Sequence, residues 1–144
     1  MTVRGDISYV LPILRRSPAG FEELTAYLRW LSDRVDLVVV DGSEPDLFRA
    51  AHDLWGQWAT HVRPRGHSLN GKVDGVTTGI GLARHEIVLV ADDDVRYDDA
   101  NLAAVSAALA DADIARPAKL LPTPALARCL GLSPLASQPL HRLG

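Results

Sequence analysis

Apolar runs alternate along this chain with amphipathic or glycine-containing segments, and the alternation predicts strands separated by helices. The runs are short and rich in β-branched residues, which is typical of parallel strands buried on both faces. They cover residues 7–12, 35–40, 60–62 and 86–91. Segments with helical character begin near residues 17, 43, 72 and 98. This order favours an α/β fold with a doubly wound, mostly parallel, Rossmann-like sheet.

Local signals predict where the helices begin and how closely they pack. A serine with a proline one or two residues later is typical of a helix N-terminus, and the chain has Ser17 before Pro18 and Ser43 before Pro45. In the third helix, Gly75, Gly79 and Gly81 lower the helix propensity. We expect these glycines to let that helix approach the sheet closely.

The chain changes character after residue 116. From Pro117 onward it contains five of the nine prolines and many leucines, whereas all 18 acidic residues lie at or before Asp113. Prolines at this density interrupt helices and central strands. We therefore expect two parts: a folded domain over residues 1–116, and a proline- and leucine-rich tail over residues 117–144 that is disordered or a frameshift product. The alternative is a short arm that packs on the domain.

Length and charge exclude several classes of protein. A chain of 144 residues corresponds to one domain, and its formal net charge of −3 does not favour binding to nucleic acid or to a membrane surface. No apolar run approaches the roughly 20 residues of a membrane-spanning helix. The single cysteine, Cys129, excludes an internal disulfide and a cysteine-based zinc cluster. We expect a cytoplasmic protein.

Three consecutive carboxylates, Asp92, Asp93 and Asp94, end the fourth apolar run. Carboxylates placed side by side repel one another, and a hard divalent cation such as Mg2+ or Mn2+ relieves that repulsion. Ligands of open α/β sheets bind at the carboxyl ends of the strands, which is where these acids are expected. The alternative interpretation is a solvated acidic turn.

Other chemically distinctive residues are expected at the same edge. Right-handed crossovers place the carboxyl ends of all parallel strands on one side of the sheet. Pro12 ends the first apolar run, and Asp41 with Gly42 ends the second. Lys72 opens the third helix, whose N-terminus favours anions. The sequence therefore predicts one site built from several strand and helix ends.

Four segments together resemble the inverting, family-two glycosyltransferases of the GT-A fold, and most closely their ceramide-glucosyltransferase-like branch. The segments are Val10-Leu11-Pro12, Val40-Asp41-Gly42-Ser43, Gly71-Lys72-Val73 and Asp92-Asp93-Asp94-Val95. The resemblance covers about residues 6 to 116. It implies that residues 1–116 are the nucleotide-sugar-binding half of a truncated GT-A domain.

The resemblance also implies roles for single residues. Asp94, with Asp92, would hold a divalent cation (Mn2+ or Mg2+) under the diphosphate of the donor, which would most naturally be a UDP-sugar. Asp92 would meet the ribose or the sugar, Asp93 at the variable middle position of the motif would tune the donor site, and Asp41 would accept a hydrogen bond from uracil. Lys72 would face the diphosphate, and Pro12 and Gly42 would line the donor site. The alternatives are a helix-capping role for Asp41 and a solvated Lys72.

The departures from that family limit the expected activity. Inverting transfer needs a general base, and no acid follows Asp113, so no catalytic residue is assigned. Leu14-Arg15-Arg16 replaces the tripeptide usual after the first strand. The alternative function is an inactive remnant that binds a nucleotide diphosphate or has no function. A sugar-phosphate nucleotidylyltransferase would need a glycine-rich loop after the first strand, and a phosphoryl receiver domain would need an acid pair there.

The sequence predicts no role in ligand binding or catalysis for the histidines and tryptophans. None of His52, His61, His67, His85 and His141 forms a helical i,i+4 pair, so we expect each to face solvent. The tryptophans Trp30, Trp55 and Trp58 are expected in or beside the core.

Overall fold

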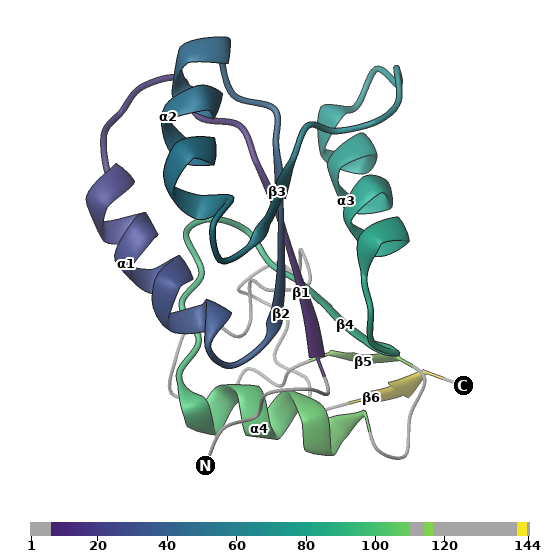
Figure 1. Ribbon diagram of the computed structural model, residues 1–144. Helices are drawn as coiled ribbons and strands as arrows, with labels where there is room; N and C mark the ends of the chain where they lie inside the picture. Colours follow the sequence, from purple (N-terminus) through teal and green to yellow (C-terminus); the bar gives the residue numbers. More distant parts are fainter. Residues whose placement is uncertain (1–6, 110–113, 117–140, 144) are drawn as a thin grey trace.

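The computed structural model describes residues 7–109, 114–116 and 141–143 (Figure 1). Its main sheet contains four strands, β1 (Ile7–Ile13), β2 (Asp36–Asp41), β3 (Thr60–Val62) and β4 (Ile87–Val90). All pairings in this sheet are parallel and the strand order is β3-β2-β1-β4. The predicted α/β fold with a parallel, doubly wound sheet is confirmed.

Helices cover both faces of the sheet (Figure 1). They are α1 (Phe21–Ser32), α2 (Pro45–Trp55), α3 (Gly71–Leu82) and α4 (Asp99–Ala108). One core joins α1, α2 and α4 to the sheet, whereas α3 packs on the opposite face over β1 and β2. The winding therefore reverses after β3, and the strands on either side of the reversal are β1 and β4.

Side-chain alternation along the strands explains the two cores. The larger core contains odd-numbered residues of β1 and the predicted helical stripe of Leu24, Leu28 and Leu31. The smaller contains Val10 and two valines of β2. Trp55 is fully buried and its Nε1 donates to Thr25 Oγ1 at 2.9 Å, so it joins α2 to α1 as a core residue.

A second, two-stranded sheet pairs β5 (Ile114–Arg116) with β6 (His141–Leu143) in antiparallel fashion. Three residues of the predicted tail, His141–Leu143, therefore form the partner of β5. The remainder of that tail, residues 117–140 and 144, lies outside the described residues. Within the described part of the chain, no helix is both long and apolar enough to cross a bilayer.

The predicted start of the first helix was wrong. Ser17 was expected to cap it, but α1 begins at Phe21 behind Gly20, which has a φ of 75°. Such a left-handed conformation suits glycine, so the chain makes one further turn before the helix begins. Ser17 Oγ instead accepts a hydrogen bond from the Ala19 amide at 3.4 Å.

The next helix begins close to the prediction, with a different cap. Pro45 is the first residue of α2, as expected, but Glu44 precedes it as the cap residue. Ser43 Oγ is occupied elsewhere, because it accepts from the Arg15 amide at 2.8 Å. The Ser43 hydroxyl therefore connects the segments that follow β1 and β2, and α2 has no side-chain cap hydrogen bond.

Candidate functional site at the carboxyl edge of the sheet

The carboxyl ends of the strands carry most of the residues that the sequence singles out. Because the four strands are parallel, Ile13 of β1, Asp41 of β2 and the residues after Val90 of β4 meet at one edge. The expected shared edge of Asp41 and the acidic triplet is therefore confirmed. The reversal of winding between β1 and β4 is the position at which α/β sheets open a crevice for ligands.

The acidic triplet forms a tight turn. The carbonyl oxygen of Asp92 accepts a hydrogen bond from the Val95 amide at 3.2 Å, which leaves Asp93 and Asp94 at the exposed tip. Ala91, just before the turn, donates its amide to the Val10 carbonyl at 3.1 Å, so the triplet is anchored to β1.

Arg96 attaches this turn to α1. Its Nε and Nη2 atoms lie 3.0 and 2.6 Å from the two carboxylate oxygens of Glu23, and its Nη1 donates to the Asp93 carbonyl at 2.6 Å. The guanidinium also lies 4.6 Å from the centre of the Tyr27 ring. The hydrogen bond from Arg96 lowers the pKa of Glu23 from its ordinary value. Sequence reasoning did not identify Arg96, because its partners lie about 70 residues away.

Lys72 reaches the turn from the first turn of α3. The Asn70 side chain caps this helix and accepts hydrogen bonds from the Lys72 and Val73 amides. Lys72 Nζ lies 2.6 Å from Asp92 Oδ1, and the two side chains are 57% and 35% exposed. An ammonium group, a helix N-terminus and a carboxylate thus meet where the winding reverses.

Asp41 is closed off from solvent. Its side chain has no exposed surface; Oδ2 lies 2.8 Å from His61 Nε2, and Oδ1 accepts from the Ser43 amide at 2.9 Å. Burial raises the pKa of the Asp41 carboxyl, but the hydrogen bonds from His61 and Ser43 outweigh it, so the pKa lies below its ordinary value. The carboxylate is therefore ionised and already bonded through both oxygens.

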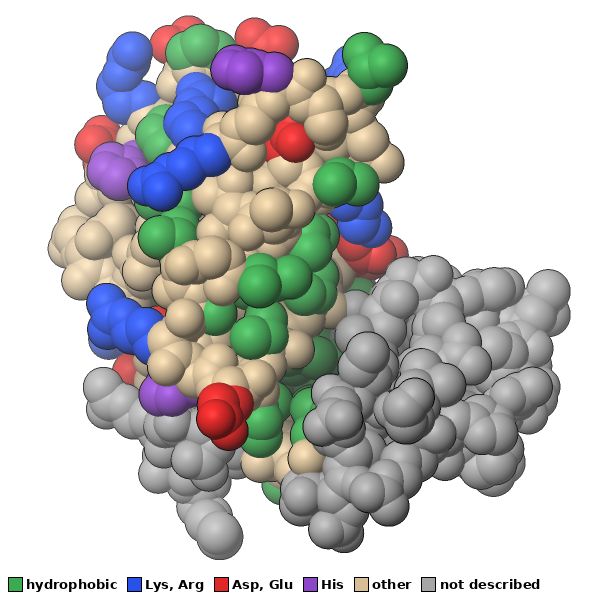
Figure 2. All heavy atoms as spheres, turned by 90° about the vertical axis from the view of Figure 1, so that its right-hand side faces the viewer, with side chains coloured by type: hydrophobic (Ala, Val, Ile, Leu, Met, Phe, Trp, Pro, Cys, Tyr) green, Lys and Arg blue, Asp and Glu red, His purple; other side chains and the backbone are tan. Residues whose placement is uncertain are grey.

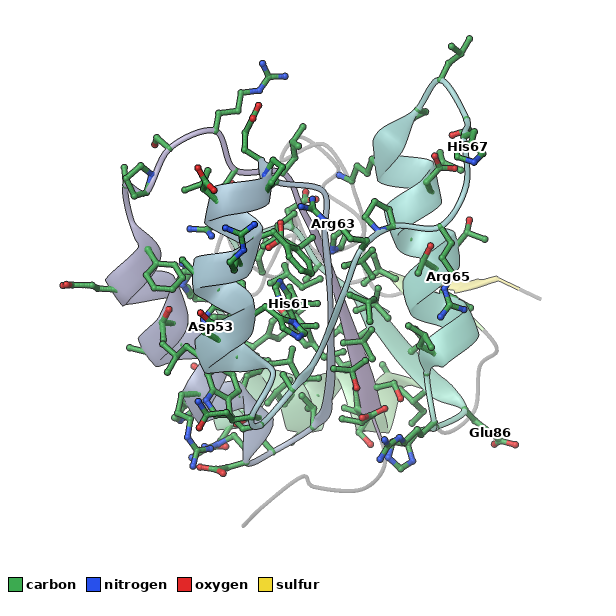
Figure 3. All side chains as sticks on the ribbon, turned by 45° about the horizontal axis from the view of Figure 1, so that its top comes forward. Asp53, His61, Arg63, Arg65, His67 and Glu86 are labelled. Atoms are coloured by element: carbon green, nitrogen blue, oxygen red, sulfur yellow. The ribbon has the colours of Figure 1, made fainter. Side chains whose placement is uncertain are left out.

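The prediction that every histidine faces solvent is wrong for His61. This residue of β3 is buried between α2 and the sheet (Figure 3). Its ring stacks on Phe48 with a centroid distance of 4.4 Å, and its Nδ1 lies 3.0 Å from Nδ1 of His52. The register places His61 beside Val39, on the face that α1 and α2 cover. The one sequence signal for burial was the short apolar run around it.

Two arginines pack around the loop after β2. The Arg15 side chain is buried, with its guanidinium 4.9 Å from the centre of the Phe21 ring and Nη2 donating to the Leu47 carbonyl at 3.3 Å. The Arg63 guanidinium lies 4.1 Å from the centre of the Phe48 ring, and its Nη1 donates to the Ser43 carbonyl. These contacts hold the loop. The family resemblance would have assigned that role to the tripeptide that Leu14-Arg15-Arg16 replaces.

Pro12 does not end its strand as expected, and Gly42 lies just past the end of β2. β1 continues through Pro12 to Ile13, whose carbonyl accepts the Gly42 amide at 2.9 Å. The Val10 carbonyl points toward β4, and groups two residues apart in a strand point to the same side. The nitrogen of Pro12 therefore faces the region beyond β4, where a missing N–H costs no ladder hydrogen bond.

The structure brings only some of the expected site residues together. Lys72 and Asp92 are in contact on the face that α3 covers. Asp41 belongs to the opposite face, with His61 and α2, and β1 lies between β2 and β4. Strand alternation causes this separation, so one ligand would have to cross the sheet edge above Pro12 to reach both acids.

The side chains at the turn are of the type that binds a hard divalent cation, but there are too few of them to fill its coordination shell. Carboxylate oxygens are the ligands that Mg2+ and Mn2+ prefer, and Asp92 already faces the positive charge of Lys72. Among the residues the structure describes, no three His, Cys, Asp or Glu side chains gather as a metal site. A cation held here would take most of its ligands from water or from a bound phosphate.

Comparisons with known proteins add no relative: no family model, no curated protein and no solved structure matches this chain.

Proposed function

We propose that this chain binds the diphosphate of a nucleotide-sugar, most naturally a UDP-sugar, as the donor-binding part of an inverting GT-A glycosyltransferase. The observation that carries the proposal is the contact between Lys72 and Asp92 at the reversal of winding. It pairs a phosphate-binding type of group with a cation-binding type of group. A helix N-terminus, which favours anions, adjoins both.

Each expected residue then has a stated role. Asp92 and Asp94 would hold Mn2+ or Mg2+ at the turn, and Lys72 would bind the diphosphate after leaving Asp92. A bound divalent cation supplies Lewis-acid stabilisation of the leaving diphosphate. The contacts of Arg96 with Glu23 and the Asp93 carbonyl hold the turn ready for the ligand. A cytoplasmic location belongs to the same proposal.

Recognition of uracil by Asp41 is the most demanding part of the proposal. Both carboxylate oxygens of Asp41 already accept hydrogen bonds, and the side chain has no exposed surface. A uracil imide reaches it only if the loop that contains Gly42 and Ser43 opens. Binding through this residue therefore predicts slower association for uridine diphosphate than for inorganic diphosphate.

A second candidate function is binding without transfer. No aspartate or glutamate follows Asp113, and the family resemblance places the general base downstream of the acidic triplet. A protein of this kind would bind uridine diphosphate together with a cation. It would not cleave a UDP-sugar to release uridine diphosphate, with or without an acceptor. Release measured by a coupled assay distinguishes the two functions.

Calorimetric titration tests the proposal. Uridine diphosphate is titrated into the full chain in Mn2+, in Mg2+ and after addition of chelator. We expect uridine diphosphate to bind at least about tenfold more tightly when a cation is present. The diphosphate would itself be a ligand of the cation, so each is expected to raise the affinity for the other by the same factor. Asp94→Asn, which removes a cation ligand, is expected to abolish this dependence.

Asp53→Asn is the matched control, since Asp53 is exposed on α2 and lies away from the turn (Figure 3). Equal affinity with cation, with chelator and in Asp94→Asn would contradict the cation role. A folded protein that does not bind uridine diphosphate in any condition would contradict the nucleotide-sugar function altogether.

A further inference from the structure

Three ionisable side chains form a continuous hydrogen-bonded row from the sheet edge to the surface of α2. Asp41 Oδ2 lies 2.8 Å from His61 Nε2, and His61 Nδ1 lies 3.0 Å from His52 Nδ1. Asp41 and His61 are buried, whereas His52 is exposed on the last turn of α2. The row thus connects a closed carboxylate to solvent through two imidazoles.

Proton positions in the row follow from the carboxylate. Asp41 is ionised and can only accept, so His61 Nε2 must carry a proton. The two Nδ1 atoms that face each other then share one proton between them. Either His52 donates to a neutral His61, or a protonated His61 donates to His52.

A second Nδ1 proton is incompatible with this contact. Two N–H groups at a separation of 3.0 Å repel each other, because neither offers a lone pair. His61 is held by Asp41 and by its stack on Phe48, whereas His52 has solvent beside it. Protonation therefore moves His52 outward and leaves His61 paired with Asp41.

The other charged groups recorded near the pair come from three segments. From the segment after β3, the Arg63 guanidinium lies 4.1 Å from the centre of Phe48, on which His61 stacks. From the segment after β1, the Arg15 guanidinium lies 5.4 Å from the centre of Trp55, whose ring meets His61 edge-on. The acid that contacts His61 is Asp41, at the end of β2.

We propose that His52 and His61 form a pH-sensitive latch, which ties the C-terminal turn of α2 to β3 while one Nδ1 proton is shared and releases it when a second proton binds. The latch is connected to the loop of Gly42 and Ser43 through Asp41, whose Oδ1 accepts the Ser43 amide at 2.9 Å. Its release leaves the Asp41–His61 pair intact.

Stability measurements with His52→Phe test the latch. Phenylalanine keeps an aromatic ring next to Phe48, which lies 5.4 Å from the His52 ring centre, but it has no Nδ1. At pH 8 we expect the unfolding equilibrium constant to rise about fivefold, which corresponds to one net hydrogen bond. At pH 5 the latch is proposed to be released by a second Nδ1 proton, so the ratio is expected to fall to about one or below.

His67→Phe is the matched control, because His67 lies on the exposed loop before α3, away from His61 (Figure 3). Its effect is expected to be independent of pH. A His52→Phe effect of equal size at pH 5 and pH 8 would overturn the latch and show that His52 contributes packing alone.

Ring 15N resonances of the unsubstituted protein give a second readout that needs no variant. One Nδ1 proton shared by His52 and His61 at pH 8, and one on each ring at pH 5, would support the latch. No Nδ1 proton on either ring at pH 8, or one on each, would overturn it.

Discussion

Gly79 of α3 lies so close to Val10 of β1 that a Cβ atom at position 79 would overlap the Val10 side chain. One turn earlier, a Cβ atom on Gly75 would come within 2.9 Å of Pro12 Cβ. Residues four apart share one face of a helix, so the two glycines form a strip without side chains, and α3 contacts β1 through this strip. This strip brings the N-terminus of α3, with Lys72, to the sheet edge.

Substitution of Gly79 by alanine tests this contact. The added methyl group must displace Val10 or the helix, and overpacking of this kind costs about 1–3 kcal/mol. We expect the free energy of unfolding in urea to fall by that amount. Gly81→Ala is the control, since a Cβ atom there meets no atom within 4 Å, and helix propensity is expected to raise stability by up to about 1 kcal/mol. Equal effects at both positions would show that α3 is not packed through this strip.

Asp41→Asn tests the buried pair with His61. Asparagine is neutral and has one oxygen, so it cannot replace both hydrogen bonds that the Asp41 carboxylate accepts from His61 Nε2 and the Ser43 amide. Such a loss costs about 1–3 kcal/mol, and we expect urea unfolding at pH 7 to show it.

The stability difference between the unsubstituted protein and Asp41→Asn is expected to decrease in acid. Because the folded-state pKa of Asp41 is below its ordinary value, the carboxylate contributes its full stability above the unfolded-state value of 3.8. That stability is lost as the pH falls through the lower, folded-state pKa. The difference between the unsubstituted protein and Asp41→Asn is therefore expected to narrow as the pH falls below about 4. A difference that widens below about pH 4 would contradict the pairing.

The fold could be predicted because its signals are local. Apolar runs and helical stripes report burial one element at a time, and the shared edge of the strand ends follows from the crossover connections. The glycine contacts were predicted for the same reason: Gly75 and Gly79 approach the sheet as expected. Gly81, by contrast, faces open space, because it lies on a different side of the helix.

The site was less predictable because its contacts join distant segments. His61 is 20 residues from Asp41, and the short apolar run around it was too weak a signal to predict a buried imidazole. Ser43 resembled a helix cap until its hydroxyl was found to accept the Arg15 amide, 28 residues away. Strand ends could be assigned to one edge, but the face on which each side chain lies depends on register, which separates Asp41 from Asp92.

The apolar outer face of α3 illustrates the same point. Val73 and Ile80 are each 50% exposed, and apolar side chains are visible on this side of the molecule (Figure 2). Their spacing, taken alone, would have predicted a buried stripe. The glycines turn the opposite face inward instead.

Arg96→Met tests whether Arg96 holds the acidic turn. The substitution removes the hydrogen bonds to Glu23 and to the Asp93 carbonyl but keeps an apolar side chain near Tyr27. We expect the amides of Val95 and Tyr97 to exchange with solvent at least about tenfold faster. The free energy of unfolding is expected to change by less than about 1 kcal/mol, because the ion pair is largely exposed.

Arg29→Met is the control for loss of a surface ion pair on α1, since Arg29 bonds Asp33 one turn away at 3.1 Å. It is expected to leave exchange at Val95 and Tyr97 unchanged. Unaltered exchange in Arg96→Met would mean that the turn is held by its own hydrogen bond from Val95 to Asp92.

Lys72→Met separates the role of Lys72 in nucleotide binding from its contact with Asp92. If Lys72 binds the diphosphate, loss of one charge-assisted hydrogen bond is expected to weaken uridine diphosphate binding in Mn2+ about tenfold, or ~1.4 kcal/mol. Binding of Mn2+ alone, followed by its electron paramagnetic resonance signal, is expected to stay equal or to tighten, because Lys72 no longer competes for Asp92. Arg84→Met removes one positive charge at the opposite edge, where the Arg84 amide bonds Ser8 Oγ at 3.0 Å, and is expected to alter neither affinity. Equal weakening of both ligands in Lys72→Met would indicate a damaged turn, and unchanged nucleotide affinity would remove Lys72 from the diphosphate site.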